Sequence, residues 1–395
     1  MKKILFAMDS LGVGGAEKSL ITLLNILSNK NYKIELILIR EEGLFLTQLP
    51  SSISILRNVN PLQFLGVSPK NISFYIKNGI PFLFKKIYRY QKAKKSHTLA
   101  IPQALWKFWE KDIKVLDTEY DVAISYLEGI TNYFVIEKVN AKKKFLWIHN
   151  EYSKLKYNNF FDYSFFKKAD NIVTISELCK QDLIKNFPEL SNKFIVLENI
   201  TNADKIKQLA EESINDNSMF TKVKGLKLLS IGRLAPQKAY DLALQAAYIL
   251  KENNINFTWF IIGEGPMRKS LEELRKNLQL DKHIYFIGLQ TNPYKYMKQA
   301  DIIIQSSRFE GKSIAIDEAK VLCKPIVSTN YNTIKDLIQD KKNGIITNMT
   351  AEDLSNGIKE LINNDKLRNT LIQNLKQEAN NNINEINKYI QLIES

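Results

Sequence analysis

The chain contains few residues that bind metal ions or form disulfide bonds. Its 395 residues include two cysteines and three histidines. Cys179 and Cys323 lie far apart in the sequence and lack the spacing of metal ligands. So few cysteines are typical of a protein in a reducing cytosol. There is also no Asp-x-Asp pattern and no histidine cluster to hold a metal ion. We therefore expect a cytoplasmic protein that uses neither a metal ion nor another cofactor.

Long apolar segments are missing as well. No uninterrupted apolar run approaches the ~20 residues needed to span a bilayer. The first residues, Met1–Asp9, lack the long apolar core and cleavage site of a signal peptide and pass directly into a strand pattern. We therefore expect a protein that does not cross a membrane by itself.

Positive charge is in excess, with 56 lysines and arginines against 42 acidic residues and a net charge of +14. Six of these cations crowd into residues 85–95. Aromatic residues surround them: Phe74, Tyr75, Phe82, Phe84, Tyr88, Tyr90, Trp106, Phe108 and Trp109. Cations beside aromatics are typical of a segment that lies on anionic lipid, so we expect peripheral association with the inner face of the plasma membrane. The alternative is a solvated basic helix with a few core aromatics. No recognition motif accompanies the basic run, so nucleic acid is not an expected partner.

Strand and helix patterns alternate in two halves, which predicts two doubly wound, Rossmann-like α/β domains facing across a cleft. The first domain is expected over residues 1–200, with a helical insertion at about 60–115. Residues 201–225 are polar and are predicted to connect the domains, and residues 226–380 form the second domain. Residues 381–395 are predicted to form a last helix. The strands are expected at residues 3–8, 34–39, 120–126, 144–148, 171–175, 226–231, 257–262, 283–287, 302–304, 325–328 and 345–346.

Two glutamates eight residues apart, Glu310 and Glu318, give the most informative stretch of the chain. They follow a predicted buried strand, Gly311 permits a tight turn, and Ser313 is a candidate N-cap for a helix from Ile314. The unpaired N–H groups of such a helix start form an anion site. One carboxylate at the mouth of the loop and one on the helix suit a long ligand with a central phosphate, such as a nucleotide sugar.

Four further loops follow predicted strands. Gly14 and Gly15 open a helix and allow close approach to a phosphate or sugar, although a plain strand–helix turn is the alternative; Glu17 stands where a dinucleotide fingerprint needs glycine. Arg233 and Lys238 lie where two cations can hold a diphosphate. His149 ends another strand, and its neutral ring is expected to donate to the donor sugar's hydroxyls or to a developing charge; a structural histidine is the alternative. The last loop contains Gly263, whose expected role is tight turning.

Six motifs in order resemble the retaining glycosyltransferases of family four, which have the two-domain GT-B fold. They are Gly14-Gly-Ala-Glu-Lys, Trp147-Ile-His-Asn, Gly232-Arg-Leu-Ala-Pro-Gln-Lys, Gly263-Glu-Gly-Pro, the glutamate pair and Asn343-Gly-Ile. The variant Glu310-Gly-Lys-Ser-Ile is similar to enzymes of capsule and cell-surface polysaccharide synthesis, but it leaves the role of Lys312 open.

The resemblance implies a hexosyltransferase that moves a sugar from a nucleoside diphosphate, UDP rather than GDP, to a lipid-linked or oligosaccharide acceptor. It implies that Glu310 contacts the donor sugar or its phosphates and that Glu318 binds the ribose hydroxyls. Backbone N–H groups of Ser313 and Ile314 would meet the diphosphate. The backbone around Leu289 and Gln290 would contact the base. The first domain would bind the acceptor and the second would bind the nucleotide sugar, and the last helix would cross back to the first domain.

Other functions stay open beside this one. A GT-B nucleotide-sugar epimerase would not need a membrane-facing insertion, and a phosphorylase usually carries a cofactor lysine motif that this sequence lacks. A non-catalytic scaffold partner is disfavoured because Arg233, Lys238, Glu310 and Glu318 are all present, and clustered charge costs stability where it has no function.

Overall fold

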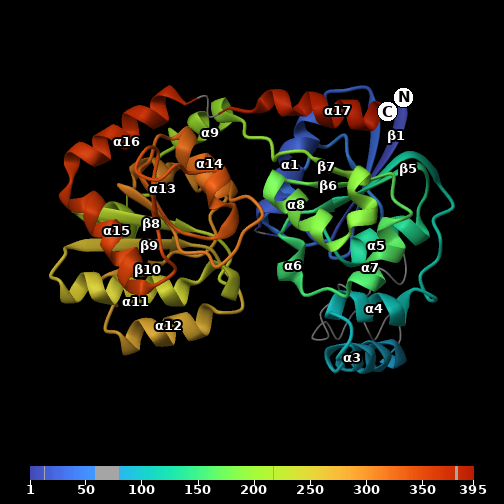
Figure 1. The fold of residues 1–395 in the computed structure, drawn as a ribbon, viewed down its shortest axis with the longest axis horizontal. Helices are drawn as coiled ribbons and strands as arrows, with labels where there is room; N and C mark the ends of the chain where they lie inside the picture. The colour runs from blue at the N-terminus through green and yellow to red at the C-terminus, as the bar shows by residue number, and fades with distance from the viewer. Residues whose placement is uncertain (13, 58–79, 217, 379–380) are drawn as a thin grey trace. The chain divides into compact units, whose positions relative to one another are not determined.

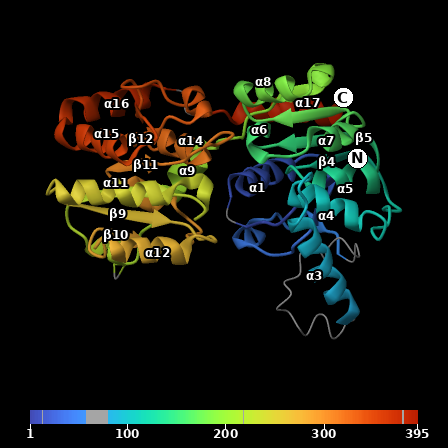
Figure 2. The ribbon, with the colours of Figure 1, turned by 60° about the horizontal axis from the view of Figure 1, so that its bottom comes forward.

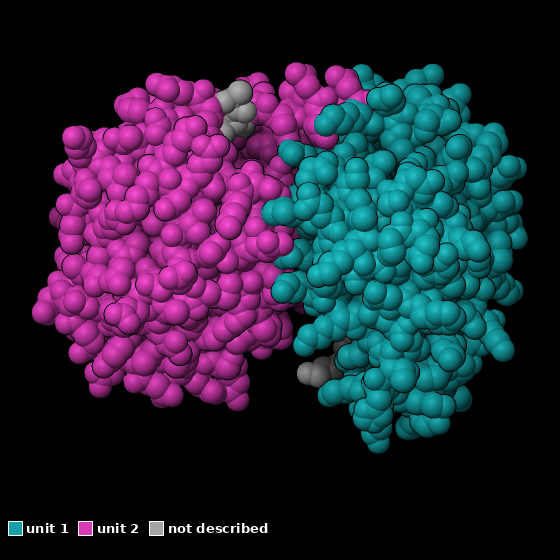
Figure 3. Space-filling view, in the orientation of Figure 1, with its two compact units in different colours: residues 1–12, 16–198, 388–395 teal, residues 13–15, 199–387 magenta. Residues whose placement is uncertain are grey.

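The computed structural model describes residues 1–12, 14–57, 80–216, 218–378 and 381–395. The chain forms two compact units, coloured separately in Figure 3. Unit 1 comprises Met1–Gly12, Ala16–Glu198 and Lys388–Ser395, and unit 2 comprises Asn199–Asn387 together with residues 14 and 15. No helix within the described ranges is both long and apolar enough to cross a membrane.

Unit 1 is built on a seven-stranded parallel sheet in the order β3-β2-β1-β4-β5-β6-β7 (Figure 1). Its strands are β1 (Lys2–Met8), β2 (Tyr32–Leu38), β3 (Ser54–Ile55), β4 (Glu119–Ser125), β5 (Asn140–Ile148), β6 (Asn171–Thr174) and β7 (Phe194–Val196). The central strands are apolar and buried over consecutive residues, as expected for a parallel sheet covered on both faces.

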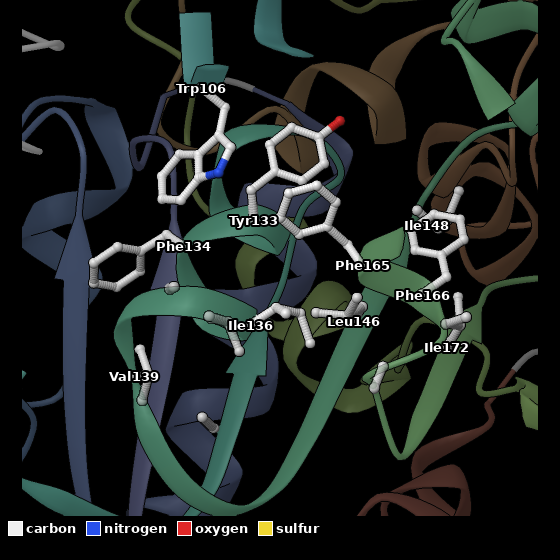
Figure 4. Close-up of a cluster of buried hydrophobic side chains, with 14 of the residues drawn as sticks. Trp106, Tyr133, Phe134, Ile136, Val139, Leu146, Ile148, Phe165, Phe166 and Ile172 are labelled. Atoms are coloured by element: carbon white, nitrogen blue, oxygen red, sulfur yellow. The ribbon is translucent and has the colours of Figure 1, made fainter. Parts of the chain in front are cut away.

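The helices of unit 1 follow its strands in the alternation that the sequence predicts. They are α1 (Gly15–Leu27), α3 (Ile80–Lys94), α4 (Ile101–Trp109), α5 (Ile130–Lys138), α6 (Tyr152–Leu155), α7 (Asn159–Phe166), α8 (Glu177–Asn186) and α17 (Ile386–Glu394), with 3-10 turns η1 (Leu44–Gln48) and η3 (Pro188–Lys193). Figure 4 shows part of the core, where Trp106 from α4, Tyr133 from α5 and Phe165 from α7 gather above the sheet.

The basic and aromatic segment divides into a buried part and an exposed part. Trp106 and Trp109 are fully buried, so the prediction that these two aromatics insert at a membrane interface is wrong. On α3, by contrast, Phe84 is 67% exposed and Tyr88 is 65% exposed. Phe74 and Tyr75, also part of the predicted aromatic set, lie outside the described residues, as does most of the predicted insertion before α3.

Unit 2 has a six-stranded parallel sheet in the order β10-β9-β8-β11-β12-β13. Its strands are β8 (Leu226–Ile231), β9 (Phe257–Ile262), β10 (Ile284–Phe286), β11 (Ile302–Gln305), β12 (Ile326–Thr329) and β13 (Ile345–Thr347). Its helices are α9 (Ala203–Ala210), α10 (Met219–Lys222), α11 (Tyr240–Glu252), α12 (Arg268–Asn277), α13 (Tyr294–Gln299), α14 (Ile314–Val321), α15 (Ala351–Asn363) and α16 (Asp365–Gln377), with 3-10 turns η4 (Pro236–Lys238), η5 (Asn332–Asp336) and η6 (Ile383–Glu385).

Successive residues of each unit 2 strand enter two different cores. Leu228 and Trp259 pack with α11, α12 and α15, whereas Leu229 and Phe260 pack with α10, α13 and α14. This alternation follows from the two-residue period of a strand. Helices consequently cover both faces of the sheet (Figure 2), which confirms the predicted doubly wound α/β class.

The segment predicted to connect the domains, residues 201–225, contains helices of unit 2 instead of an open linker. Helix α9 buries Ala203, Ile206 and Ala210, which share one face of the helix, and it packs beside α13 and α14. The apolar residues are small and few, so the segment reads as polar even though their spacing supports an amphipathic helix.

The last helix, α17, packs within unit 1. The hydroxyl of Tyr389 donates to the carbonyl of Glu198 at 3.0 Å, and its ring stacks on Trp147 with centroids 6.0 Å apart. Lys2 Nζ donates to the carbonyls of Ile393 and Glu394 at 2.9 and 3.0 Å, near the C-terminal end of the helix. Tyr389 and the C-terminal end of the helix are thereby fixed to unit 1, whereas its first two residues, Ile386 and Asn387, belong to unit 2.

Candidate active site

Two loops meet at the carboxyl edge of the unit 2 sheet. Strands β8 and β11 are neighbours, with Ile302 opposite Leu228 and Ile303 opposite Leu229. Because parallel strands end at the same edge, the loop of residues 232–239 lies beside the loop of residues 306–313. These loops carry three of the four predicted catalytic residues: Arg233, Lys238 and Glu310.

Glu310 is the centre of a buried polar cluster. Its Oε1 atom accepts hydrogen bonds from Lys238 Nζ at 2.6 Å, Ser307 Oγ at 2.6 Å and Gln305 Nε2 at 3.0 Å. Its Oε2 atom accepts a longer bond from Gln237 Nε2 at 3.3 Å. The residue is only 7% exposed, so it is more enclosed than a carboxylate at the mouth of a loop.

The two predicted diphosphate-binding cations have different environments. Lys238 pairs with Glu310, and its side chain is 18% exposed. Arg233 is exposed, and its guanidinium has no hydrogen-bond or ion-pair partner among the described residues. An incoming anion would therefore find one uncompensated cation and one that already has a counterion.

Side chains outside the predicted site tie the two loops together. Arg308 makes two bonds to the Asp241 carboxylate, at 3.0 and 2.7 Å, and a third to the carbonyl of Pro236. Ser306 Oγ donates to the carbonyl of Lys238 at 2.7 Å, and Gln237 Nε2 donates to the carbonyl of Phe309 at 3.0 Å. These bonds hold the cation loop in place before any ligand binds, which favours a preorganised electrostatic site.

Glu318 lies on α14 and is buried, with 3% exposure, so it is not a solvent-facing helix residue. The hydroxyl of Tyr294 donates to its Oε1 atom at 3.0 Å. Ser313 stands at the N-cap position of α14, but its side chain makes no capping hydrogen bond, contrary to the predicted capping role. The backbone N–H groups at this helix start, including that of Ile314, are therefore not capped by a serine side chain.

Gly263 has a structural role. It has φ of +150°, and a Cβ atom there would lie 2.0 Å from the carbonyl oxygen of Gly232. This contact agrees with the expectation of tight turning, because the loop after β9 presses against the cation loop after β8. Leu289 is 38% exposed on the loop after β10. Gln290 uses its side chain internally, between the carbonyl of Ile287 and the hydroxyl of Tyr296.

His149 ends β5 in unit 1 and is 6% exposed. Burial lowers its pKa from 6.5, while the charge of Glu128 and a hydrogen bond to the Tyr126 backbone act in the opposite direction. Nε2 is buried and has no hydrogen-bond partner among the described residues.

The surroundings of His149 were not predicted. Its backbone N–H donates to Glu128 Oε2 at 3.0 Å, and the other Glu128 oxygen accepts from Asn150 Nδ2 at 2.6 Å. The Tyr126 ring lies 5.1 Å from the His149 ring and its hydroxyl is 2.8 Å from Ser19 Oγ. Ser19 lies on α1, the helix that begins at Gly15 and follows Gly14.

Sequence reasoning also missed Gln305, Ser307, Gln237 and Tyr294. Gln305 and Ser307 have a local signal, because they stand five and three residues before Glu310 at the end of the same strand. Gln237 joins the site through the pairing of β8 with β11, and Tyr294 reaches Glu318 from α13. No group of three or more histidine, cysteine, aspartate or glutamate side chains able to hold a metal ion occurs in the described parts of the chain.

Residues 211–378 match the family model for group 1 glycosyl transferases. The chain is 27% identical, over 96% of its own length and 95% of the relative's, to the Campylobacter jejuni N-acetylgalactosamine-N,N'-diacetylbacillosaminyl-diphospho-undecaprenol 4-alpha-N-acetylgalactosaminyltransferase. It is 26% identical to the Escherichia coli UDP-Gal:alpha-D-GlcNAc-diphosphoundecaprenol alpha-1,3-galactosyltransferase, over 44% of this chain and 46% of that one. The chain spans about half the length of several other curated relatives that it matches.

Among solved structures, the chain is similar to Anabaena HepE in complex with UDP-glucose. The TM-score is 0.71 at 16% identity, and the similarity covers 99% of this chain and 98% of HepE. This likeness confirms the GT-B fold.

Proposed function

We propose that this chain, a group 1 glycosyl transferase by its residues 211–378, transfers a hexose from a nucleoside diphosphate to a lipid-linked glycan with retention of configuration. The observation that carries the proposal is the pair of cations, Arg233 and Lys238, on a loop fixed beside Glu310 at the edge of the unit 2 sheet. A leaving nucleoside diphosphate gains negative charge as the glycosidic bond breaks, and two fixed cations stabilise that charge. Such a site needs no metal ion for this step.

The donor is proposed to be a UDP-sugar, since the similar Escherichia coli enzyme has UDP-Gal as its donor by name. Glu318 would accept hydrogen bonds from the ribose hydroxyls, because one carboxylate can accept two such bonds. Backbone N–H groups at Ser313 and Ile314 would bind the diphosphate. The base would contact the backbone near Leu289 and Gln290.

The acceptor is proposed to be a glycan on a diphosphate lipid, because the Campylobacter relative acts on a diphospho-undecaprenol glycan by name. In unit 1, the neutral ring of His149 would donate a hydrogen bond to a hydroxyl of the donor sugar or to a developing charge. No carboxylate is assigned as a covalent nucleophile. The departing diphosphate would itself take the acceptor proton in a front-face reaction.

A screen of nucleotide sugars tests the donor. A donor at 100 times its dissociation constant should raise the unfolding free energy by about 2.7 kcal/mol. Transfer from the best binder to a diphosphate-lipid glycan should then give an α-linked product from an α-linked donor. Failure of every UDP-sugar and GDP-sugar to bind would refute the proposal. Binding without transfer would instead favour a non-catalytic scaffold.

We also propose that α3 rests on an anionic membrane surface. Phe84, Ile87 and Tyr88 share one face of the helix at spacings of three and four residues, and all three are exposed. Lys94 and Lys95, at the end of the helix, are exposed cations beside them. Apolar side chains can enter the membrane interface, and cations attract acidic headgroups. Both therefore favour the binding of α3 to an anionic membrane surface.

The vesicle test must avoid cations that stabilise unit 1. Lys85 and Arg89 pair with Asp112, and the Arg89 guanidinium lies 4.3 Å from the Trp109 ring centroid, so reversing their charge would also damage the core. Replacing Lys94 and Lys95 by glutamate should instead release the protein from phosphatidylglycerol vesicles. Each cation near the membrane surface contributes about 1 kcal/mol to the free energy of vesicle binding.

The matched control places glutamate at Lys282 and Lys366, two exposed lysines of unit 2. It changes the net charge equally and should leave vesicle binding nearly intact. Equal release by both pairs would show that total charge, rather than α3, governs binding.

A further inference from the structure

The Lys238 ammonium already has a counterion in the unliganded site. Its Nζ atom lies 2.6 Å from Glu310 Oε1, and the two side chains are 18% and 9% exposed. Charge-assisted bonds in so enclosed a position are stronger than surface ion pairs, because little water screens them. A diphosphate that takes Lys238 as a ligand must therefore displace or share a strong existing partner.

The carboxylate of Glu310 cannot readily move away when that happens. Ser307 Oγ and Gln305 Nε2 also donate to Oε1, and Gln305 Nε2 lies 2.8 Å from Ser307 Oγ. These residues are buried, and the Thr333 hydroxyl holds the backbone carbonyl of Glu310 at 2.8 Å. The negative charge thus remains beside Lys238 whether or not the ammonium turns toward a ligand.

The two oxygens of Glu310 have different hydrogen-bonding capacity left. Oε1 accepts three bonds, whereas Oε2 accepts only the 3.3 Å bond from Gln237. A carboxylate oxygen has about two lone-pair sites, so Oε2 alone retains one for a sugar hydroxyl. Glu310 can therefore contact the donor sugar through Oε2 while Oε1 keeps its hold on Lys238.

From this arrangement we infer that Glu310 competes with the diphosphate for Lys238 and thereby promotes release of the nucleoside diphosphate product. The inference rests on the proposed function and adds a second role for Glu310. With the sugar still attached, contact at Oε2 offsets the repulsion between carboxylate and diphosphate. After transfer the sugar contact is gone, the repulsion remains, and the Lys238–Glu310 pair re-forms as the product leaves.

The test is Glu310→Gln, which keeps the shape of the side chain and removes its charge. Titration calorimetry with UDP and GDP as probes should show product affinity for the better ligand increased on the order of tenfold, the usual effect of one charged hydrogen bond. The inhibition constant of that nucleotide in the transfer assay should fall by the same factor, while kcat decreases. Damage to the site would instead weaken nucleotide binding. The sign of the change in nucleotide affinity therefore distinguishes damage from the loss of competition by Glu310.

The matched control is Asp281→Asn. It breaks the Arg275–Asp281 ion pair of unit 2, which lies just before β10 and outside both loops of the site. Nucleotide affinity in this variant should stay within about twofold of the wild type, because the charge around Lys238 is unchanged. A tenfold gain in the control as well would overturn the inference, since the loss of any negative charge from unit 2 would then explain both results.

The outcomes separate this inference from the proposed function. If the wild type binds neither UDP nor GDP, the proposed function fails and the inference fails with it. If the wild type binds UDP and Glu310→Gln binds it equally or more weakly, the inference alone is overturned. Should Glu310→Gln fail to fold, Glu310→Asp provides a second test, because it draws the carboxylate back from Lys238 by one methylene. Its nucleotide affinity should exceed that of the wild type by a smaller factor. No increase in affinity in Glu310→Asp would also refute the inference.

Discussion

Replacing Tyr389 by alanine should destabilise unit 1, although the residue is only six positions from the last residue, Ser395. Tyr389 is 2% exposed, stacks on Trp147 and donates to the carbonyl of Glu198. Truncating a buried aromatic side chain costs about 3–5 kcal/mol. Of this, about 1 kcal/mol belongs to the hydrogen bond, which Tyr389→Phe would remove alone.

The assay is thermal unfolding followed by a signal that reports on unit 1. For a domain of this size, 1 kcal/mol shifts the midpoint by about 2–4 °C, so Tyr389→Ala should lower it by roughly 10 °C. Tyr389→Phe should lower it by only a few degrees. The matched control is Gln391→Ala, an exposed position on the same helix, which should leave the midpoint almost unchanged.

Hydrogen exchange locates the damage. Amides of α17 and of the neighbouring strand β5 should exchange faster in Tyr389→Ala, whereas those of β8 to β13 should keep their protection. Unchanged unfolding of unit 1, or loss of protection in unit 2 instead, would refute the assignment of the last helix to unit 1.

Three further predictions concern charge. Arg233→Ala and Lys238→Ala should each cut turnover by roughly 10²–10³. Arg233→Ala should leave stability almost unchanged, whereas Lys238→Ala should also lower it, because it leaves the Glu310 carboxylate buried without its counterion. Wild-type turnover should survive EDTA, and loss of activity that manganese restores would contradict the cation argument. Burial raises the pKa of Asp162 above 3.8, so the folded state binds the Asp162 proton more tightly than the unfolded chain does. The contribution of Asp162 to the unfolding free energy should therefore fall as the pH rises from about 4 through the raised pKa. Urea titrations of Asp162→Asn should lack this fall. Glu128→Gln removes a charge that favours protonated His149, so the acid limb of the kcat/KM profile should move to lower pH, and a move to higher pH would contradict the electrostatics.

The strands and the ligand edge could be predicted from the sequence because their signals are local. Apolar runs such as Ile302–Ile304 indicate buried parallel strands wherever they occur, and residues that follow them must lie at the carboxyl edge. Arg233, Lys238 and Glu310 were placed at that edge for this reason. The pairing of Lys238 with Glu310 was not predictable, because it depends on which strands are neighbours.

The errors have related causes. Trp106 and Trp109 were assigned to an interface because composition cannot distinguish an aromatic that faces the core from one that faces solvent. The capping role of Ser313 followed from residue type alone, whereas a cap also needs the right side-chain direction. The helix that begins at Ala203 was hidden because its buried residues are mostly alanine.

The position of α17 delays the completion of unit 1 during synthesis. Domains generally fold as they leave the ribosome, the N-terminal one first. Unit 1 lacks the partner of Trp147 and Lys2 until the last residues of the chain are released, whereas all of unit 2 has by then been synthesised. Lys2 also bonds the carbonyls of Ile393 and Glu394, so the two termini lie side by side. A short peptide joining them would give a circular permutant in which α17 is made together with the strand it anchors.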